Sequence, residues 1–271
     1  MTLDPSIDAF YTSYSEATRL DWSYFQMERE RTQEIVERHL PQPPAEVLDV
    51  GGGPGAYALW LARKGYAVQL VDPVALHVTQ ASERSEAQQP HRLKGVGVGD
   101  ARQLDQESKS ADAVLLLGPL YHLTARGDRL QALGEAKRVL RKGGVLFAAA
   151  ISRFASFFDG LRGALFQDPE FERIVRADLH DGQHRNDTGR IEYFTTAFFH
   201  KPDEFLLELR EAGFEAALYG LEGPAGLLAD FDALWREPGS RSKLLDFLRL
   251  IEREPSLLGL SAHILAVARP R

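Results

Sequence analysis

The chain has 271 residues, a formal net charge of −7 and no cysteine. This length allows one large domain with a substantial core, and the lack of cysteine excludes disulfides, thiolate metal sites and cysteine nucleophiles and fits a cytoplasmic protein. The acidic balance argues against a nucleic-acid partner, which needs a basic surface, and neither a signal peptide nor a membrane-spanning apolar run is visible.

The first forty residues have a helical pattern. Aromatic and aliphatic side chains recur between Ile7 and Leu40 and predict an apolar helix face. The sequence Pro41-Gln42-Pro43-Pro44 cannot continue a helix and delivers an extended chain to the next segment. We therefore expect a helical cap over residues 1–40.

Strand and helix patterns alternate from residue 46 onward. The segments that predict strands lie at residues 46–50, 67–71, 93–98, 113–117, 145–150, 216–219 and 263–268. Helical patterns precede or follow them at residues 56–64, 76–88, 126–140 and 201–212. This alternation predicts an α/β fold with a mainly parallel sheet.

Two stretches interrupt the alternation. Residues 152–196 are aromatic, charged and helical in character, as expected of a lid, and residues 225–257 form a second insertion before the last strand. We expect a single domain over residues 1–271. Its parts are the N-terminal cap (1–40), a cofactor-binding core (41–151), a cap insertion (152–196) and the C-terminal part of the core (197–271), which contains the second insertion.

A glycine cluster follows the first predicted strand. Gly51, Gly53 and Gly55 allow a turn whose backbone passes close to a ligand, and a helix pattern begins immediately after them. A glycine turn at a helix N-terminus is the geometry that dinucleotide sites and several other cofactor sites share. The spacing Gly51-x-Gly53-x-x-Ala56 fits a relaxed dinucleotide-binding pattern, and Gly51-x-Gly53-x-Gly55 fits another glycine pattern. The turn alone therefore does not identify the cofactor.

Further residues at strand ends narrow the choice of cofactor. Asp72 lies at the tip of the second strand, where a carboxylate can accept both hydroxyls of a ribose. Asp100 and Ala101 follow the third strand, and the segment Gly118-Pro119-Leu120-Tyr121-His122-Leu123 follows the fourth.

Together these residues resemble the class I S-adenosylmethionine-dependent methyltransferases, over roughly residues 40–150 and the final helix and strands. The resemblance implies a Rossmann-like sheet of seven strands, mainly parallel, with helices on both faces, helical cap insertions and only the last strand antiparallel. It implies S-adenosylmethionine as the cofactor. The cofactor-binding residues it implies are Asp49, Gly51, Gly53, Gly55, Asp72, Asp100, Ala101, Leu117, Tyr14 and Arg19, the last two on an N-terminal helix that closes over the cofactor together with Tyr11.

The resemblance also concerns the acceptor. The segment after the fourth strand, and the segment Phe198–Phe205, are similar to those of small-molecule methyltransferases. In-line methyl transfer to an oxygen, nitrogen or carbon of a small-molecule acceptor is the implied reaction, without a nucleic-acid or membrane partner. Where the acceptor must lose a proton, Tyr121, His122 and His200 are the candidate bases, with packing as the alternative role for each.

Other interpretations of the sequence remain. His180 and His184 are four residues apart, but no third ligand is evident, so we predict a solvated helix face and no metal. An NAD(P)-dependent oxidoreductase would account for the glycine turn and Asp72, but not for Asp49 or Asp100. A nucleic-acid or protein methyltransferase should show a basic strip or an acceptor motif, and a binding protein that keeps the cofactor structurally is a further alternative.

Overall fold

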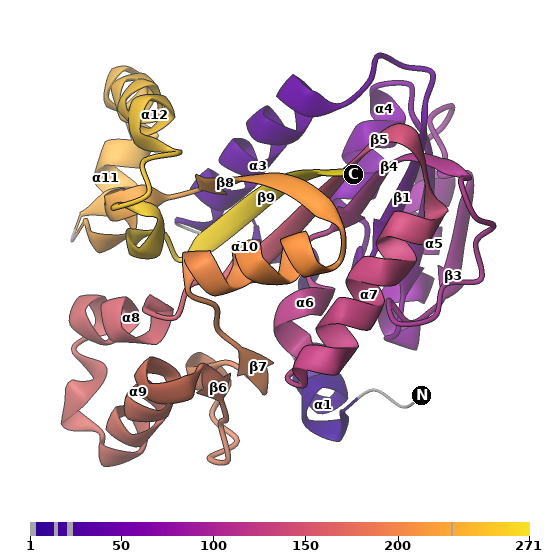
Figure 1. The fold of residues 1–271 in the computed structure, drawn as a ribbon. Helices are drawn as coiled ribbons and strands as arrows, with labels where there is room; N and C mark the ends of the chain where they lie inside the picture. The colour runs from indigo at the N-terminus through magenta and orange to yellow at the C-terminus, as the bar shows by residue number, and fades with distance from the viewer. Residues whose placement is uncertain (1–3, 14–15, 21–23, 229) are drawn as a thin grey trace.

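A single large sheet organises the structure, a computed structural model that describes residues 4–13, 16–20, 24–228 and 230–271. Seven strands lie in the order β3-β2-β1-β4-β5-β9-β8 (Figure 1). In chain order they are Glu46–Val50 (β1), Ala67–Asp72 (β2), Gly95–Val98 (β3), Ala111–Leu116 (β4), Leu140–Ile151 (β5), Phe214–Gly220 (β8) and His263–Pro270 (β9). Only β9 is antiparallel to its neighbours, so the predicted seven-stranded, mainly parallel sheet is confirmed.

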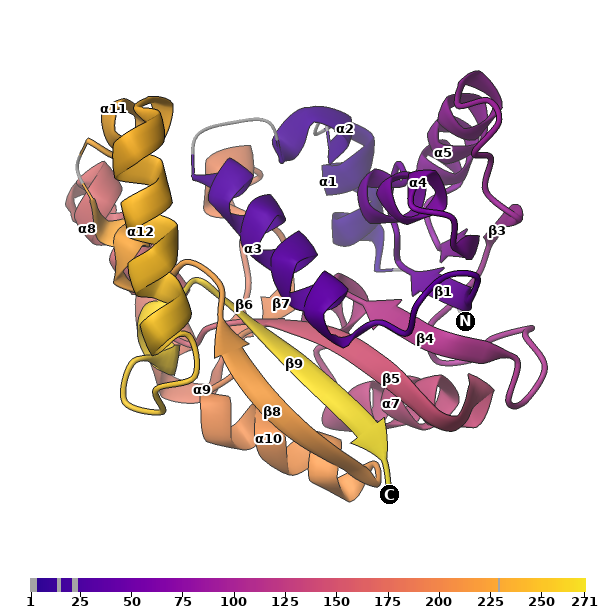
Figure 2. The ribbon, with the colours of Figure 1, turned by 90° about the horizontal axis from the view of Figure 1, so that it is seen from above.

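Helices cover both faces of this sheet, as predicted (Figure 2). One face carries α7 (Arg126–Val139) and α10 (Pro202–Glu211), and the other carries α3 (Phe25–His39), α4 (Ala56–Arg63) and α5 (Ala75–Ala87). Each helix turns an apolar stripe toward the strands, which lie between two separate hydrophobic clusters. The strands are therefore buried on both sides, which accounts for their nearly continuous apolar sequences.

The N-terminal residues form three helices where the sequence showed one continuous pattern. They are α1 (Pro5–Ser13), α2 (Glu16–Arg19) and α3. Ile35 and Val36 of α3 are fully buried against the sheet core, whereas Tyr11 of α1 contacts His122 in the short helix that follows β4. The three helices therefore have different surroundings, which a single periodic pattern does not reveal.

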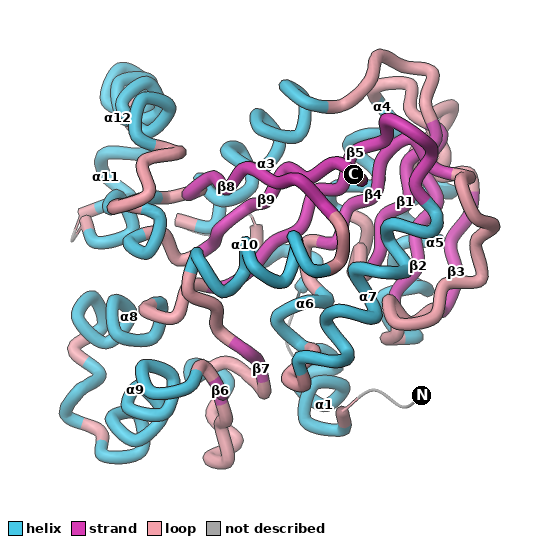
Figure 3. The backbone as a smooth tube through the Cα atoms, in the orientation of Figure 1, coloured by secondary structure: helices cyan, strands magenta, loops and turns pink. Residues whose placement is uncertain are grey.

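The remaining segments are mostly helical and lie beside and below the sheet in Figure 3. The helices are α6 (Pro119–His122), α8 (Ala155–Gly163), α9 (Pro169–Asp181), α11 (Phe231–Arg236) and α12 (Pro238–Ile251). Short 3₁₀ helices lie at Leu165–Gln167 (η1), Ile191–Tyr193 (η2), Gly223–Leu227 (η3) and Leu258–Leu260 (η4), and Gln183–His184 (β6) pairs with Ala197–Phe198 (β7). Trp235 and Leu245 pack with Met27 of α3, so the second insertion is attached to the N-terminal helices.

None of the described helices has both the length and the apolar character that a membrane crossing requires.

Candidate active site

One large cavity lies at the carboxyl ends of the parallel strands, the edge where open α/β sheets bind ligands. Its volume is about 560 Å³, and it is bounded by the loops that follow β1 to β4 and by the N-terminal helices. Because β9 is antiparallel, its first residue, His263, also lies at this edge of the sheet. The predicted site residues that line the cavity are Asp49, Gly51, Gly53, Asp72, Asp100, Leu117, Arg19, Tyr121 and His122.

The glycine loop after β1 is fixed by its own backbone. The Gly51 amide donates to the Val71 carbonyl at 2.7 Å, and Gly51 has a φ of 68°, in the region that favours glycine. A Cβ at Gly51 would lie only 2.6 Å from a side-chain carbon of Pro119. A side chain at Gly51 would therefore both strain the backbone and collide with the loop after β4.

Asp49 is a buried acid without a full set of partners. Its side chain is 2% exposed, and its Oδ2 atom has no hydrogen-bond partner. Burial, with a smaller contribution from the negative charge of Asp72, raises the pKa of Asp49 to about 7. A Cβ at Gly52 would lie 2.7 Å from Oδ2, so only glycine leaves room there. An unpaired carboxylate beside a cavity is a ready partner for a cationic group.

Asp72 connects the ends of β1 and β2. Its Oδ2 accepts from the Gly53 amide at 2.8 Å, and its Oδ1 accepts from the Val74 amide at 2.9 Å. His77, which the sequence analysis did not select, also lines the cavity, and its Nδ1 lies 3.2 Å from Oδ1. The acid therefore shapes the glycine loop in addition to facing the cavity.

Asp100 is hydrogen-bonded to an arginine, Arg102, that the sequence analysis did not select. The Arg102 side chain donates to both carboxylate oxygens of Asp100, at 2.6 to 3.2 Å, and to Asp128 at 2.8 Å. Burial alone would raise the pKa of Asp100, but the hydrogen bonds from Arg102 hold it below the usual value. All three side chains line the cavity.

Three predicted site residues, Gly55, Ala101 and His200, do not line the cavity. Gly55 is the N-cap of α4, and Ala101 lies in the core beneath the sheet, so neither lines the cavity. Tyr14 lies outside the described residues. His200 is fully buried away from the cavity, with its Nε2 3.2 Å from Glu208 Oε2, because the strand end that carries it faces α10. Its position does not support a role as the acceptor-side base.

On the side of the cavity that the N-terminal helices close, α1 contacts α6, the helix after β4. Tyr11 Oη lies 2.7 Å from His122 Nε2, and His122 Nδ1 lies 3.3 Å from the Thr196 carbonyl. Burial lowers the pKa of His122 to about 4 and raises the pKa of Tyr11 and of Tyr121, so all three are neutral near pH 7. The neutral imidazole then donates from Nδ1 and accepts the Tyr11 proton at Nε2.

A row of charged side chains supports the same side of the cavity, and its members are Glu16, Arg19, Glu28, His263 and Glu222. Arg19 donates to Glu16 at 2.9 Å and to both oxygens of Glu28 at 2.7 and 3.1 Å. His263 Nδ1 lies 2.7 Å from Glu222 and 3.8 Å from Glu28. Burial opposes protonation of His263, but the negative charges of Glu28 and Glu222 outweigh it and raise its pKa to about 9.

The same row contains the candidate metal ligands among the described residues. Glu28, Glu222 and His263 have ligand atoms within 4.8 Å of one another. Arg19 already binds Glu28, and the protonated ring of His263 donates to Glu222. The carboxylates are therefore neutralised by protein cations, and a metal would have to displace them.

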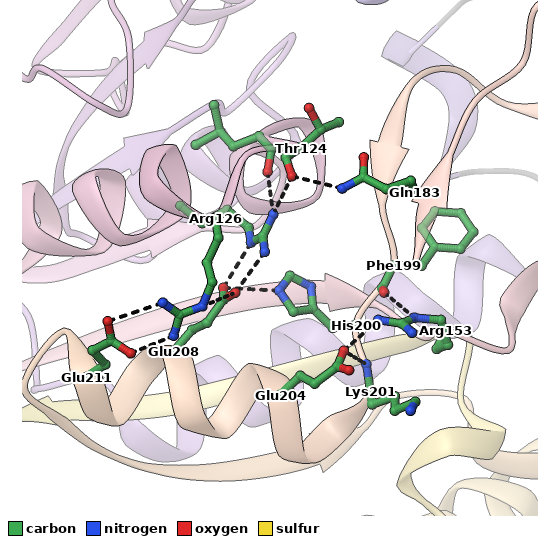
Figure 4. A network of polar contacts seen from close by, with 12 residues as sticks. Thr124, Arg126, Arg153, Gln183, Phe199, His200, Lys201, Glu204, Glu208 and Glu211 are labelled. Atoms are coloured by element: carbon green, nitrogen blue, oxygen red, sulfur yellow. Dashed lines mark hydrogen bonds and ion pairs between the residues drawn. The ribbon is translucent and has the colours of Figure 1, made fainter. Parts of the chain in front are cut away.

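A buried ion pair between Arg129 and Glu208 supports this side, and Figure 4 shows the network of polar contacts around Glu208. Arg129, 2% exposed, donates to the Leu123 and Thr124 carbonyls, each at 2.9 Å, and to both oxygens of Glu208 at 2.9 and 2.8 Å. Its guanidinium also lies 3.8 Å from the ring centre of Phe198. Leu123 and Thr124 line the cavity, so this pair ties the cavity wall to α10 and β7.

The pair of histidines at 180 and 184 does not share a solvated face. The His180 side chain is 85% exposed. His184 lies in β6, beyond the end of α9, and is buried, with its ring between Asp178, at 2.9 Å, and the Tyr193 carbonyl, at 2.8 Å. The helix ends before His184 at Gly182, which has a φ of 80°, so the predicted spacing on one helix was wrong.

Comparison with known proteins agrees with this geometry. Residues 47–144 match the family described as Methyltransferase domain. The ubiquinone/menaquinone biosynthesis C-methyltransferase of Acidiphilium cryptum is 30% identical over 210 residues, which cover 75% of this chain and 78% of the relative.

Two solved structures have the same fold. A methyltransferase dependent on S-adenosylmethionine from Methanosarcina mazei has a TM-score of 0.59 and 18% identity, over 87% of this chain and 96% of that one. The [4+2]-cyclase SpnF has a TM-score of 0.57 and 19% identity, over 95% of this chain and 86% of that one.

The strand order, the glycine loop and the strand-end acids define a Rossmann-like enzyme with a nucleoside cofactor. The relative from Acidiphilium cryptum matches over most of its length, and this match identifies the family within that class. The chain belongs to the class I S-adenosylmethionine-dependent methyltransferases. The methyl donor is therefore S-adenosylmethionine, which decides against the nicotinamide alternative.

Proposed function

We propose that this methyltransferase acts on a small-molecule acceptor bound between the glycine loop and the N-terminal helices. One observation carries the proposal: α1 and α2 close this side of the cavity through Tyr11–His122 and Arg19–Glu28. The enclosed volume of about 560 Å³ suits a cofactor together with a small acceptor. Residues 1–40, 152–196 and 225–257 are, in this proposal, caps on a single domain.

The residues that line the cavity fit the cofactor. The unpartnered Oδ2 of Asp49 suits the ammonium of the methionine part, and Asp72 suits the ribose. The glycine loop leaves room for the cofactor to approach the backbone, and Asp100 and Leu117 suit its adenine and sulfonium regions. Arg19 borders the methionine end. Gly55 and Ala101 would act only through the loop that they support.

When bound, the cofactor supplies an activated methyl group that an acceptor atom attacks in line. The chain's own residues orient the acceptor and exclude water, and such positioning is worth several kcal/mol. Tyr121 and His122 border the place where the acceptor would lie. Where the attacking atom carries a proton, the unprotonated Nε2 of His122, now hydrogen-bonded to Tyr11, is the group available to accept it.

The charge of the cavity supports an acceptor without phosphates. Among the described residues that line it, six are acidic and three are arginines. The aromatic rings of Tyr11 and Tyr121 suit a flat organic molecule. The relative from Acidiphilium cryptum is named as a C-methyltransferase of quinone biosynthesis, which supports an organic acceptor and makes carbon methylation the first reaction to test.

Formation of S-adenosylhomocysteine tests the proposal. The purified chain is incubated with S-adenosylmethionine and, separately, with hydroquinones, other phenols, amines, total RNA and a mixed protein extract. We expect turnover with a member of the small-molecule sets. Methyl incorporation into RNA or protein, with none into small molecules, would contradict it, and cofactor binding without turnover on any acceptor would favour a binding role.

A further inference from the structure

The carboxylate of Asp72 has little hydrogen-bonding capacity left for a ligand. It already accepts from the Gly53 amide at 2.8 Å, from the Val74 amide at 2.9 Å and from His77 Nδ1 at 3.2 Å. A carboxylate offers about four lone-pair positions, so these three donors leave room for about one more. The ribose of the cofactor has two adjacent hydroxyl groups, and one of them therefore needs another acceptor.

His77 lies beside Asp72 and carries a second nitrogen that can accept a hydrogen bond. It lies in the first turn of α5, is 4% exposed and lines the cavity. In the neutral ring, the nitrogen that faces the carboxylate, Nδ1, carries the proton, and Nε2 then has a lone pair. That Nε2 is buried and has no hydrogen-bond partner.

An unpartnered buried polar atom is costly, and native structures seldom keep one without a reason. The ring of His77 is held from two sides, by Asp72 and by an edge contact with Tyr11 whose ring centre is 5.4 Å away. It cannot turn Nε2 toward a protein partner without losing the contact at Nδ1. Nε2 therefore stays free for a donor that the described residues do not supply.

We propose that His77 is a cofactor-binding residue that accepts one ribose hydroxyl at Nε2 while Asp72 accepts the other. Both acceptors must be filled for the cavity to bind its ligand fully, so the pair selects a nucleoside with two free hydroxyls. A 2′- or 3′-deoxy sugar leaves one acceptor empty, and a phosphorylated sugar brings a negative charge against Asp72. The inference rests on the cofactor of the family and not on the identity of the acceptor.

Titration calorimetry with S-adenosylhomocysteine and its 2′-deoxy and 3′-deoxy analogues tests this pairing. In His77→Phe the ring remains but the acceptor nitrogen is lost. Wild type should bind S-adenosylhomocysteine about tenfold more tightly than the analogue that lacks the hydroxyl facing His77. The variant should bind S-adenosylhomocysteine about tenfold more weakly than wild type and should lose nothing further with that analogue.

A structural role for His77 predicts a different result. His77→Phe would then weaken S-adenosylhomocysteine and both analogues by the same factor, and this additivity would overturn the proposal. Leu76→Ala, a neighbouring change at a side chain that is 41% exposed, should alter none of the affinities. If wild type fails to bind S-adenosylhomocysteine at all, the cofactor site assigned to the cavity is itself wrong.

Nitrogen NMR of the wild-type chain gives a test that needs no folded variant. The ¹⁵N signal of His77 Nε2 should shift when S-adenosylhomocysteine is added, because its lone pair gains a donor. It should shift much less with the analogue without the relevant hydroxyl. Equal shifts with all three ligands would overturn the proposal.

Discussion

The two sides of the cavity are built in different ways. On the cofactor side, the glycine loop and the strand ends are held by backbone hydrogen bonds, such as Gly51 to Val71 and Gly53 to Asp72. On the side where we propose that the acceptor binds, called the acceptor side below, side chains from distant parts of the chain meet, such as Tyr11 with His122 and Glu28 with His263.

The difference indicates how each side responds to change. Backbone geometry tolerates few substitutions at a small number of positions, whereas the side-chain contacts are individually weaker and depend on charge and pH. We expect single changes on the cofactor side to weaken cofactor binding. Changes on the acceptor side should loosen the cap and leave the cofactor bound.

The largest effect is expected from Gly51→Val. Valine is strained at a φ of 68°, and its Cβ would collide with Pro119. Binding of S-adenosylhomocysteine should fall by about 100-fold or more, measured by calorimetry. The control is Gly97→Val in β3, where a Cβ meets no atom within 4 Å. Normal binding by Gly51→Val would show that the loop is not part of the cofactor site.

The second effect concerns His263 and the stability of the acceptor side. Its folded pKa of about 9 lies above the ordinary value of 6.5, so its contribution is complete below pH 6.5 and is lost as pH rises through 9. At about 1.4 kcal/mol per pH unit, the difference between these two pKa values corresponds to about 3 kcal/mol in the free energy of unfolding. Urea unfolding of wild type should show this loss, and His263→Gln should not.

The matched control for that experiment is His180→Gln, because the His180 side chain is 85% exposed. It should keep the wild-type dependence on pH. Parallel curves for wild type and His263→Gln between pH 6.5 and 9 would contradict the assignment of the charge to this row.

The third prediction is Asp49→Asn. An amide cannot neutralise an ammonium group, so affinity for S-adenosylhomocysteine should fall by about tenfold at pH 8. In wild type the pKa of about 7 means that Asp49 must lose a proton to bind a cation below that pH. Affinity should therefore fall by about tenfold per pH unit below 7, whereas the variant should show no such dependence.

Asp105→Asn, at an exposed acid, is the control for the Asp49 experiment and should behave as wild type. A wild-type affinity that stays constant between pH 5 and 8 would show that Asp49 does not meet the ammonium.

The smallest effect is expected from Tyr11→Phe, which removes the hydrogen bond to His122. The loss of about 1 kcal/mol should raise hydrogen exchange of the α1 amides by about fivefold. Binding of S-adenosylhomocysteine should change by less than about twofold. Tyr66→Phe removes a hydrogen bond to the Pro41 carbonyl, away from α1, and should leave α1 unchanged. Unaltered exchange in Tyr11→Phe would mean that other contacts hold the helix.

Most of the fold and the cofactor side could be predicted from sequence because their signals are local. A strand followed by glycines, and an acid at the next strand end, occupy a few consecutive residues, and sheet topology then brings them together. Asp49, Asp72 and Asp100 all line the cavity for this reason. Ala101 itself does not line the cavity, whereas its neighbour Arg102 does, so the role predicted for Ala101 stays a prediction.

The acceptor side could not be predicted in the same way. His122 and His200 each stand after a short apolar stretch, and nothing local indicates that one lines the cavity while the other pairs with Glu208. His77 carried a weak signal, since it is five residues after Asp72 and lies in the first turn of a helix. Glu222 and His263 come together only because the antiparallel β9 starts at the same edge where β8 ends.

The direction of β9 has a practical consequence for work with the protein. Arg271 follows β9, and its amide donates to the Gly213 carbonyl at 3.0 Å, at the sheet edge opposite the cavity. Asp4 and Pro5, in contrast, line the cavity itself. A fluorophore attached to the side chain of residue 271 should leave ligand binding unperturbed, whereas one attached at Asp4 would stand at the wall of the cavity.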